Sequence, residues 1–118
     1  MSHDTFTDAY IECALWSSTD ENGNPLDDNY DTCDLAESTV AEMVADCADF
    51  QESYADLLEQ AGDDSANGHD FWLTRNRHGA GFWDRGHPAD VGKGLTDAAH
   101  AYGSRDLYVG DDGKVYQG

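Results

Sequence analysis

Lysine and arginine are absent from the first 70 residues of this 118-residue chain. These 70 residues carry 19 acids, whereas residues 71–118 carry 6 acids and all 6 bases, so the net charge of −19 belongs to the first part alone. Because such a charge repels phosphates, we expect no direct binding to nucleic acid. It favours attraction to a partner protein with a basic surface.

Long apolar runs are also missing: none approaches the ~20 residues of a membrane span. The opening "MSHDTFTDAYIEC" lacks the basic start of a signal peptide. The three cysteines Cys13, Cys33 and Cys47 have no close spacing, which argues against a disulfide framework and against a thiolate metal site. We therefore expect a cytoplasmic protein with reduced thiols and no membrane partner.

Apolar periodicity is present, and 39% of the residues are apolar, which suffices for one domain over residues 1–118. The spacing predicts a helix over residues 5–16, a loop over 17–29 and a long helix over 35–61. Asp34 with Glu37 is a possible capping box for the long helix, and Gly62 is placed to end it.

The second part is predicted to be richer in strands. "HDFWLTR" and "GFWDRG" are typical of a hairpin, "VGKGLTDAAHAYG" of a short helix and "DLYVGDDGKVYQ" of a second hairpin. The predicted class is α+β: one long acidic amphipathic helix packed on a small antiparallel sheet of two hairpins, with a short helix between them. Residues 1–62 would form an acidic helical part and residues 69–118 a charge-neutral, β-rich part.

The long predicted helix has two faces. One is apolar and should face the core: Val40, Met43, Val44, Cys47, Phe50, Tyr54, Leu57 and Leu58. The opposite face is purely acidic. Together with two acids just before the helix, it gives the candidate partner-binding residues: Asp31, Asp34, Glu42, Asp46, Asp49, Glu52, Asp56 and Glu59.

The aromatic and basic residues each allow two interpretations. Phe71, Trp72, Phe82 and Trp83 could stack on bases, but a small domain needs such rings in its core, which we favour. Arg75, Arg77 and Arg85 could clamp an anion beside the turn "HGAG". We favour instead ion pairs with Asp70, with Asp84 or with the acidic helix, because no P-loop lysine follows that turn.

No constellation for catalysis or metal binding is recognisable. His69, His78 and His87 are nine residues apart, without a metal-binding motif or a nucleophile in a known context. "DDG" at residues 111–113 lacks the further oxygen ligands of a calcium loop. We expect no enzyme activity, no cofactor and no metal.

Long strings of the chain are similar to a known group of proteins. "HDFWLTRNRHGAGFWDRG", "LTDAAHAYGSRDLYVGDDGKVY", "ALWSSTDENGNPLDDNYD" and "DLAESTVAEMVADCADF" cover most of it. They resemble small proteins common in tailed-phage and prophage genomes. The resemblance implies a phage-encoded accessory protein in the host cell cytoplasm, and it brings no activity or functional residue with it.

These observations lead to two hypotheses about function. An acid every three or four residues of a helix places a charge per ~4.5–6 Å, close to the ~3.4 Å between phosphates of one DNA strand. The first hypothesis is an acidic, DNA-mimicking inhibitor of a host nucleic-acid-handling protein, of the anti-CRISPR or anti-restriction type. The second is a protein-interaction or structural module that uses the aromatic hairpin, with acidity serving solubility or adaptation to a salty cytoplasm.

Overall fold

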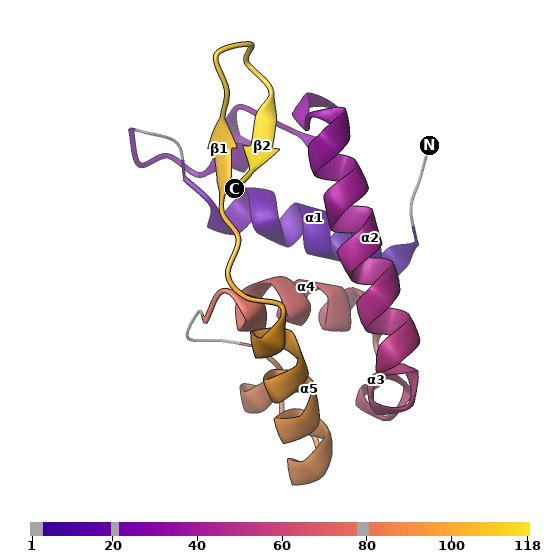
Figure 1. Ribbon diagram of the computed structural model, residues 1–118. Coiled ribbons are helices and arrows are strands. Elements are labelled where there is room, and N and C mark those ends of the chain that lie inside the picture. Colours follow the sequence, from indigo (N-terminus) through magenta and orange to yellow (C-terminus); the bar gives the residue numbers. More distant parts are fainter. Residues whose placement is uncertain (1–3, 20–21, 78–80) are drawn as a thin grey trace.

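The computed structural model describes residues 4–19, 22–77 and 81–118 (Figure 1). Most of the described chain is helical, and two short strands form one antiparallel sheet, so the fold is broadly α+β. The helices are α1 (Thr5–Ser17), α2 (Glu37–Ser53), α3 (Ala55–Ala61), α4 (Asp64–Arg75) and α5 (Ala89–Ala101). The short 3₁₀ helices are η1 (Leu26–Asp28), η2 (Thr32–Asp34) and η3 (Phe82–Asp84), and the strands are β1 (Leu107–Val109) and β2 (Val115–Gln117).

Helix α1 is the central element, and its prediction is confirmed. Asp4 caps its first turn by accepting a hydrogen bond from the Thr7 backbone N–H at 2.8 Å. The helix contacts α2, α4 and η1, and Figure 1 shows it crossing behind α2 and lying along α4. Side chains are buried on most of its circumference, which leaves Glu12 and Trp16 exposed on the remaining face.

The predicted first hairpin is wrong, because "HDFWLTR" belongs to α4. Asp63 caps this helix by accepting from the backbone N–H groups of Ser65 and Ala66. Residues 70–75 are all buried although Asp70, Thr74 and Arg75 are polar, so polarity along the segment does not reveal a helical period. "GFWDRG" contains η3, and the turn residues 78–80 between the two segments lie outside the described residues.

The predicted long helix is broken. Tyr54 has φ −124° and ψ 29°, outside the helical region, and it separates α2 from α3. Figure 1 shows α3 turned away from the axis of α2. Gly62 ends α3 with φ 103°, as expected.

The predicted capping box is displaced. Asp31 and Asp34 form one around η2, whereas α2 begins after Ala36 without a side-chain cap. Glu37, the predicted partner of Asp34, is instead the first residue of α2. The start of α2 is held by a bond from the Ala36 backbone N–H to the Val115 carbonyl at 3.0 Å.

The short helix and the second hairpin are confirmed. Helix α5 begins at Ala89, two residues earlier than "VGKGLTDAAHAYG", and Gly103 follows it with φ 77°. Strands β1 and β2 pair antiparallel, with Tyr108 opposite Tyr116. Strand β2 also meets the segment before α2 through a bridge between Leu35 and Val115, which ties the hairpin to the helices.

The core contains a cluster of aromatic rings. Phe50 stacks on Phe71 at a centroid distance of 4.0 Å, and Phe6, Tyr10, Trp72 and Phe82 are buried near them. The favoured core role of the aromatic segments is thus confirmed for Phe71, Trp72 and Phe82. Trp83 is the exception, since 58% of it is exposed.

The apolar face predicted for residues 35–61 does face the core, to differing depths. Met43, Cys47, Phe50 and Leu58 are buried. Val40, Val44, Tyr54 and Leu57 are half-buried. In the described part of the chain, no helix is both long and apolar enough to cross a membrane.

Candidate functional site

Asp46, one of the predicted partner-binding acids, is engaged inside the molecule. Its carboxylate accepts from Arg75 Nη1 at 2.8 Å, and the Arg75 side chain is only 1% exposed. The same guanidinium donates to the Tyr10 hydroxyl and to the carbonyls of Tyr102 and Gly103. The favoured ion pair between an arginine and the acidic helix is therefore present, and Asp46 serves the fold.

Two further acids of α2 also have internal partners. Asp49 accepts a hydrogen bond from the Tyr102 hydroxyl. Burial raises the pKa of Tyr102, and the hydrogen bond to Asp49 raises it further, so the phenol stays protonated and remains a donor. Glu42 lies 3.5 Å from Arg105 Nη2 in an exposed and therefore weak pair. Half of the predicted acidic face thus turns toward the second part of the chain.

Asp31 and Asp34 contribute to local structure. The Asp31 carboxylate accepts from the Cys33 backbone N–H, and the Asp34 carboxylate accepts from the Asp31 backbone N–H, each at 2.9 Å. The pair therefore stabilises η2, and Asp31 is exposed while it does so.

The remaining predicted acids point outward. Glu52, Asp56 and Glu59 are exposed, and their carboxylates have no ion pair or hydrogen bond with any described residue. Glu52 and Asp56 line one hollow of about 320 Å³ at the break between α2 and α3. These three acids, here called the outer acids, therefore form a smaller free acidic surface than the sequence predicts.

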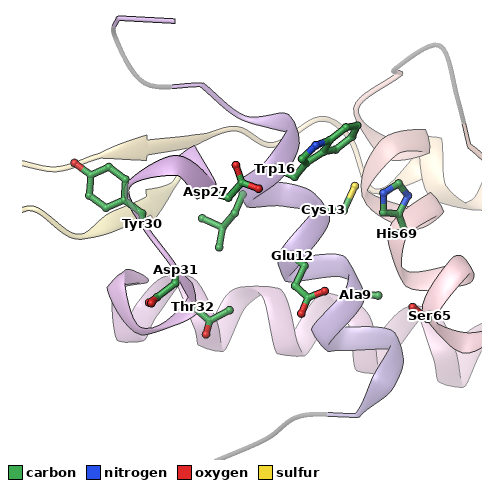
Figure 2. A pocket seen from close by; sticks show the side chains of 11 residues that line it. Ala9, Glu12, Cys13, Trp16, Asp27, Tyr30, Asp31, Thr32, Ser65 and His69 are labelled. Atoms are coloured by element: carbon green, nitrogen blue, oxygen red, sulfur yellow. The ribbon is translucent and has the colours of Figure 1, made fainter. Parts of the chain in front are cut away.

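A larger groove of about 650 Å³ lies over the exposed face of α1 (Figure 2). From α1 it is lined by Ala9, by Glu12 and Cys13 one turn later, and by Trp16 one turn after those. The segment of η1 and η2 contributes Asp27 and Tyr30, and α4 closes the other side with Ser65 and His69. We call this hollow the α1 groove.

Carboxylates and aromatic rings dominate the α1 groove. Glu12, Asp27 and Asp31 line it, and no lysine or arginine does so among the described residues. Trp16 is 57% exposed, and its ring lies 6.0 Å from that of His69, centroid to centroid. The groove thus joins negative charge to an open aromatic face.

Cys13 is the one thiol among the described residues that line the α1 groove, and its environment favours the protonated form. Burial raises its pKa to about 12, and the nearby Asp70 carboxylate adds to the rise. Asp70 is itself buried and accepts hydrogen bonds from Arg85 Nε and Nη2, as the favoured ion-pair interpretation predicts. The thiol therefore stays protonated at neutral pH.

The other candidates for catalysis or metal binding are not brought together. His69 lines the α1 groove and His87 is half-buried after η3, while His78 lies outside the described residues. Among residues 4–19, 22–77 and 81–118, no three His, Cys, Asp or Glu gather as metal ligands would. Arg75 and Arg85 are both occupied by carboxylates.

Comparison with known proteins adds no family. No family model, no curated protein and no solved structure matches the chain. The assignment of function therefore rests on the surfaces described above.

The α1 groove was missed by sequence reasoning. The periodicity of "TFTDAYIECALW" predicts a helix but does not indicate that Trp16 lies outside the core. One signal was available: Glu12 and Trp16 are four residues apart, so they share a helix face, and a carboxylate beside a tryptophan is unusual for a core face.

Proposed function

We propose that this chain is a phage-type acidic accessory protein that binds a basic surface of a host nucleic-acid-handling protein and inhibits it by occupying the place of DNA. The observation that carries the proposal is the uncompensated charge of residues 1–70, which hold 19 acids and no base. Partners of the anti-CRISPR or anti-restriction kind, meaning host effectors with a DNA groove, have the complementary charge.

The internal ion pairs support a revised binding face. Glu42, Asp46 and Asp49 are drawn toward Arg105, Arg75 and Tyr102, so they offer little to a partner. The outer acids Glu52, Asp56 and Glu59 remain free, on two helices that meet at Tyr54. We therefore assign the mimicry to the outer acids, with Asp31 and the acids around the α1 groove as a second negative area.

The test measures affinity for a partner captured from bacterial lysate. The Glu52→Lys, Asp56→Lys, Glu59→Lys variant reverses charges that the fold does not use. We expect it to keep the helical circular dichroism of the wild type and to lose partner binding at least tenfold. DNA should compete for the partner, and binding should weaken steeply over a salt series.

A control reverses two acids elsewhere. Asp97 is exposed on α5, where it pairs with Lys93 in the charge-neutral part, and Asp106 is exposed just before β1. Asp97→Lys and Asp106→Lys should leave partner binding within twofold of wild type. Equal binding by the outer-acid variant and the wild type would reject the mimicry.

Asp46→Lys is unsuitable for this test. It would place an ammonium group against the buried Arg75 guanidinium, so the chain would lose stability for reasons unrelated to binding.

A second candidate function is a non-mimic interaction module. Trp83 favours it, because this ring is 58% exposed on η3 while Phe71, Trp72 and Phe82 are buried. The variant Trp83→Ala distinguishes this module from DNA mimicry. The module is supported if Trp83→Ala loses the partner while the outer-acid variant still binds it.

A further inference from the structure

The α1 groove has the chemistry of a site for a cationic side chain. Its volume of about 650 Å³ exceeds the size of one amino-acid side chain, and it opens beside an exposed tryptophan. This area is separate from the outer acids, because its residues come from α1, the η1–η2 segment and α4.

Trp16 supplies the aromatic face. A tryptophan that is 57% exposed on a central helix loses apolar burial that neighbouring α1 side chains gain. The ring is steadied from one side by His69, which comes from α4 and stands 6.0 Å away. The exposed part of the ring is available to stack with a planar cation.

Carboxylates line the same groove as the ring. Glu12 stands one turn before Trp16 on the same face of α1, and Asp27 lies near Trp16 in Figure 2. Neither carboxylate has an ion pair or hydrogen bond with a described residue, whereas Asp31 is held by the Cys33 N–H. Glu12 and Asp27 are therefore the acceptors that a ligand could use.

Arginine fits these groups better than lysine does. A guanidinium is planar, stacks on an indole ring and offers several N–H donors at once to carboxylates. Lysine presents a compact ammonium group that is more strongly hydrated and lacks the stacking face.

We propose that the α1 groove binds an arginine side chain of the partner protein, with Trp16 as the stacking platform and Glu12 and Asp27 as the acceptors. The inference rests on the proposed function, because DNA-binding surfaces of host effectors are rich in arginine. It adds a specific anchor to the general attraction exerted by the outer acids.

The experiment titrates the protein with a capped Gly-Arg-Gly tripeptide and follows the indole N–H signals by NMR. We expect the Trp16 signal to shift with a saturable curve while the Trp83 signal does not. Trp83 is the matched control, since it is 58% exposed against 57% for Trp16 but stands on η3, away from the groove. A tripeptide with citrulline in place of arginine should leave both signals unchanged.

Variants locate the contact. Glu12→Gln with Asp27→Asn should weaken tripeptide binding at least fivefold, and Trp16→Ala should weaken it similarly when followed by backbone amide signals. Glu52→Gln with Asp56→Asn removes the same charge from the outer acids, and it should change the tripeptide affinity by less than twofold. Equal shifts of Trp16 and Trp83, equal binding of citrulline, or equal effects of the two charge-neutral pairs would each overturn the inference.

Partner capture separates this inference from the proposed function. If outer-acid reversal abolishes capture while Trp16→Ala does not weaken it, the function stands and the groove is not the anchor. If the tripeptide binds at Trp16 but no basic partner is captured, the groove is an arginine site and the inhibitor function fails.

Discussion

Arg75 is the residue on which several parts of the fold converge. It stands at the end of α4 and reaches Tyr10 of α1, Asp46 of α2 and the carbonyls of Tyr102 and Gly103 after α5. A buried guanidinium is tolerated only when its donors are matched, and here Nε, Nη1 and Nη2 all find acceptors. Arg75 thus converts one acid of the negatively charged part into a link between the two parts of the chain.

Replacing Arg75 by methionine should be severely destabilising. The change would leave the Asp46 carboxylate, the Tyr10 hydroxyl and two carbonyls without their donor, which costs about 3–5 kcal/mol of unfolding free energy. Urea denaturation followed by circular dichroism measures the loss. Lys93→Gln, which breaks an exposed pair with Asp97, should leave the urea midpoint unchanged. A loss below about 1 kcal/mol for Arg75→Met would mean that the network does not hold the parts together.

The three thiols should differ in reactivity. Cys33 is exposed, whereas Cys13 and Cys47 are buried. Burial raises the pKa of Cys13 from its ordinary 9.0 to about 12, and burial also raises the pKa of Cys47. In the native protein at pH 8, only Cys33 should therefore react quickly with a thiol reagent, which consumes one equivalent. All three thiols should react only after the protein is unfolded in urea. A Cys33→Ser variant that still reacts quickly would contradict this.

The same shifts fix the sign of a pH effect. Because the folded pKa of Cys13 is raised, its contribution to stability is present below pH 9.0 and is lost as the pH rises toward 12. Unfolding experiments should show declining stability across this alkaline range. Constant stability there would show that Cys13 is solvated in the folded protein.

At the scale of elements, the helices and strands that could be predicted are those with a clear apolar periodicity or clear turn residues. Helices α1, α2 and α5 and the C-terminal hairpin follow from apolar periodicity and turn residues. Helix α4 did not, because its buried surface includes the polar residues Asn67, Asp70, Thr74 and Arg75, so its polar and apolar residues do not separate into two faces in the sequence. The break at Tyr54 has no Pro or Gly to mark it, so it depends on tertiary packing.

The candidate sites show the same division. The sequence shows that acids line α2. It does not show the internal partners of Asp46 and Asp49, because these come from α4 and the end of α5, far away in sequence. The α1 groove likewise needs α4 to pack beside α1. Spacing along one segment could not reveal either arrangement.

Gly68 permits the crossing of α1 and α4. A Cβ at this position would lie 2.0 Å from the Phe6 carbonyl oxygen, and backbone cannot move aside as a flexible side chain can. Although alanine is the better helix former by about 1 kcal/mol, we expect Gly68→Ala to destabilise the protein by about 1–3 kcal/mol through overpacking.

A second helical glycine provides the comparison. Gly94 lies in α5, where an added Cβ would meet a Leu57 methyl group at 2.9 Å, and that side chain can shift. Gly94→Ala should therefore cost much less or stabilise the protein. Thermal melts of both variants measure the difference. Equal changes in melting temperature would show that α1 and α4 do not approach as closely as described.

The whole molecule carries its charge asymmetrically. The bases Arg75, Arg85, Lys93 and Arg105 each pair with a carboxylate inside the chain. The net charge of −19 remains after all 6 bases are counted, so the outer acids and the acids of the α1 groove repel one another across an object about 43 × 28 × 21 Å in extent. Repulsion of this kind opposes the compact state, and a basic partner would relieve it.

Salt should therefore stabilise the isolated chain. Raising NaCl from about 20 mM to about 300 mM shortens the screening length from about 20 Å to below 10 Å, which weakens repulsion between separated acids. The buried Arg75–Asp46 pair is screened far less, so relief of repulsion wins, and the melting temperature should rise by roughly 3–8 °C.

The neutral variant Glu52→Gln, Asp56→Asn, Glu59→Gln should melt higher than wild type at low salt and respond less to added salt. A melting temperature that falls with salt would mean that attraction dominates the surface. A melting temperature that rises only above about 1 M NaCl would instead support adaptation to a salty cytoplasm, because repulsion between separated acids is already screened at that concentration.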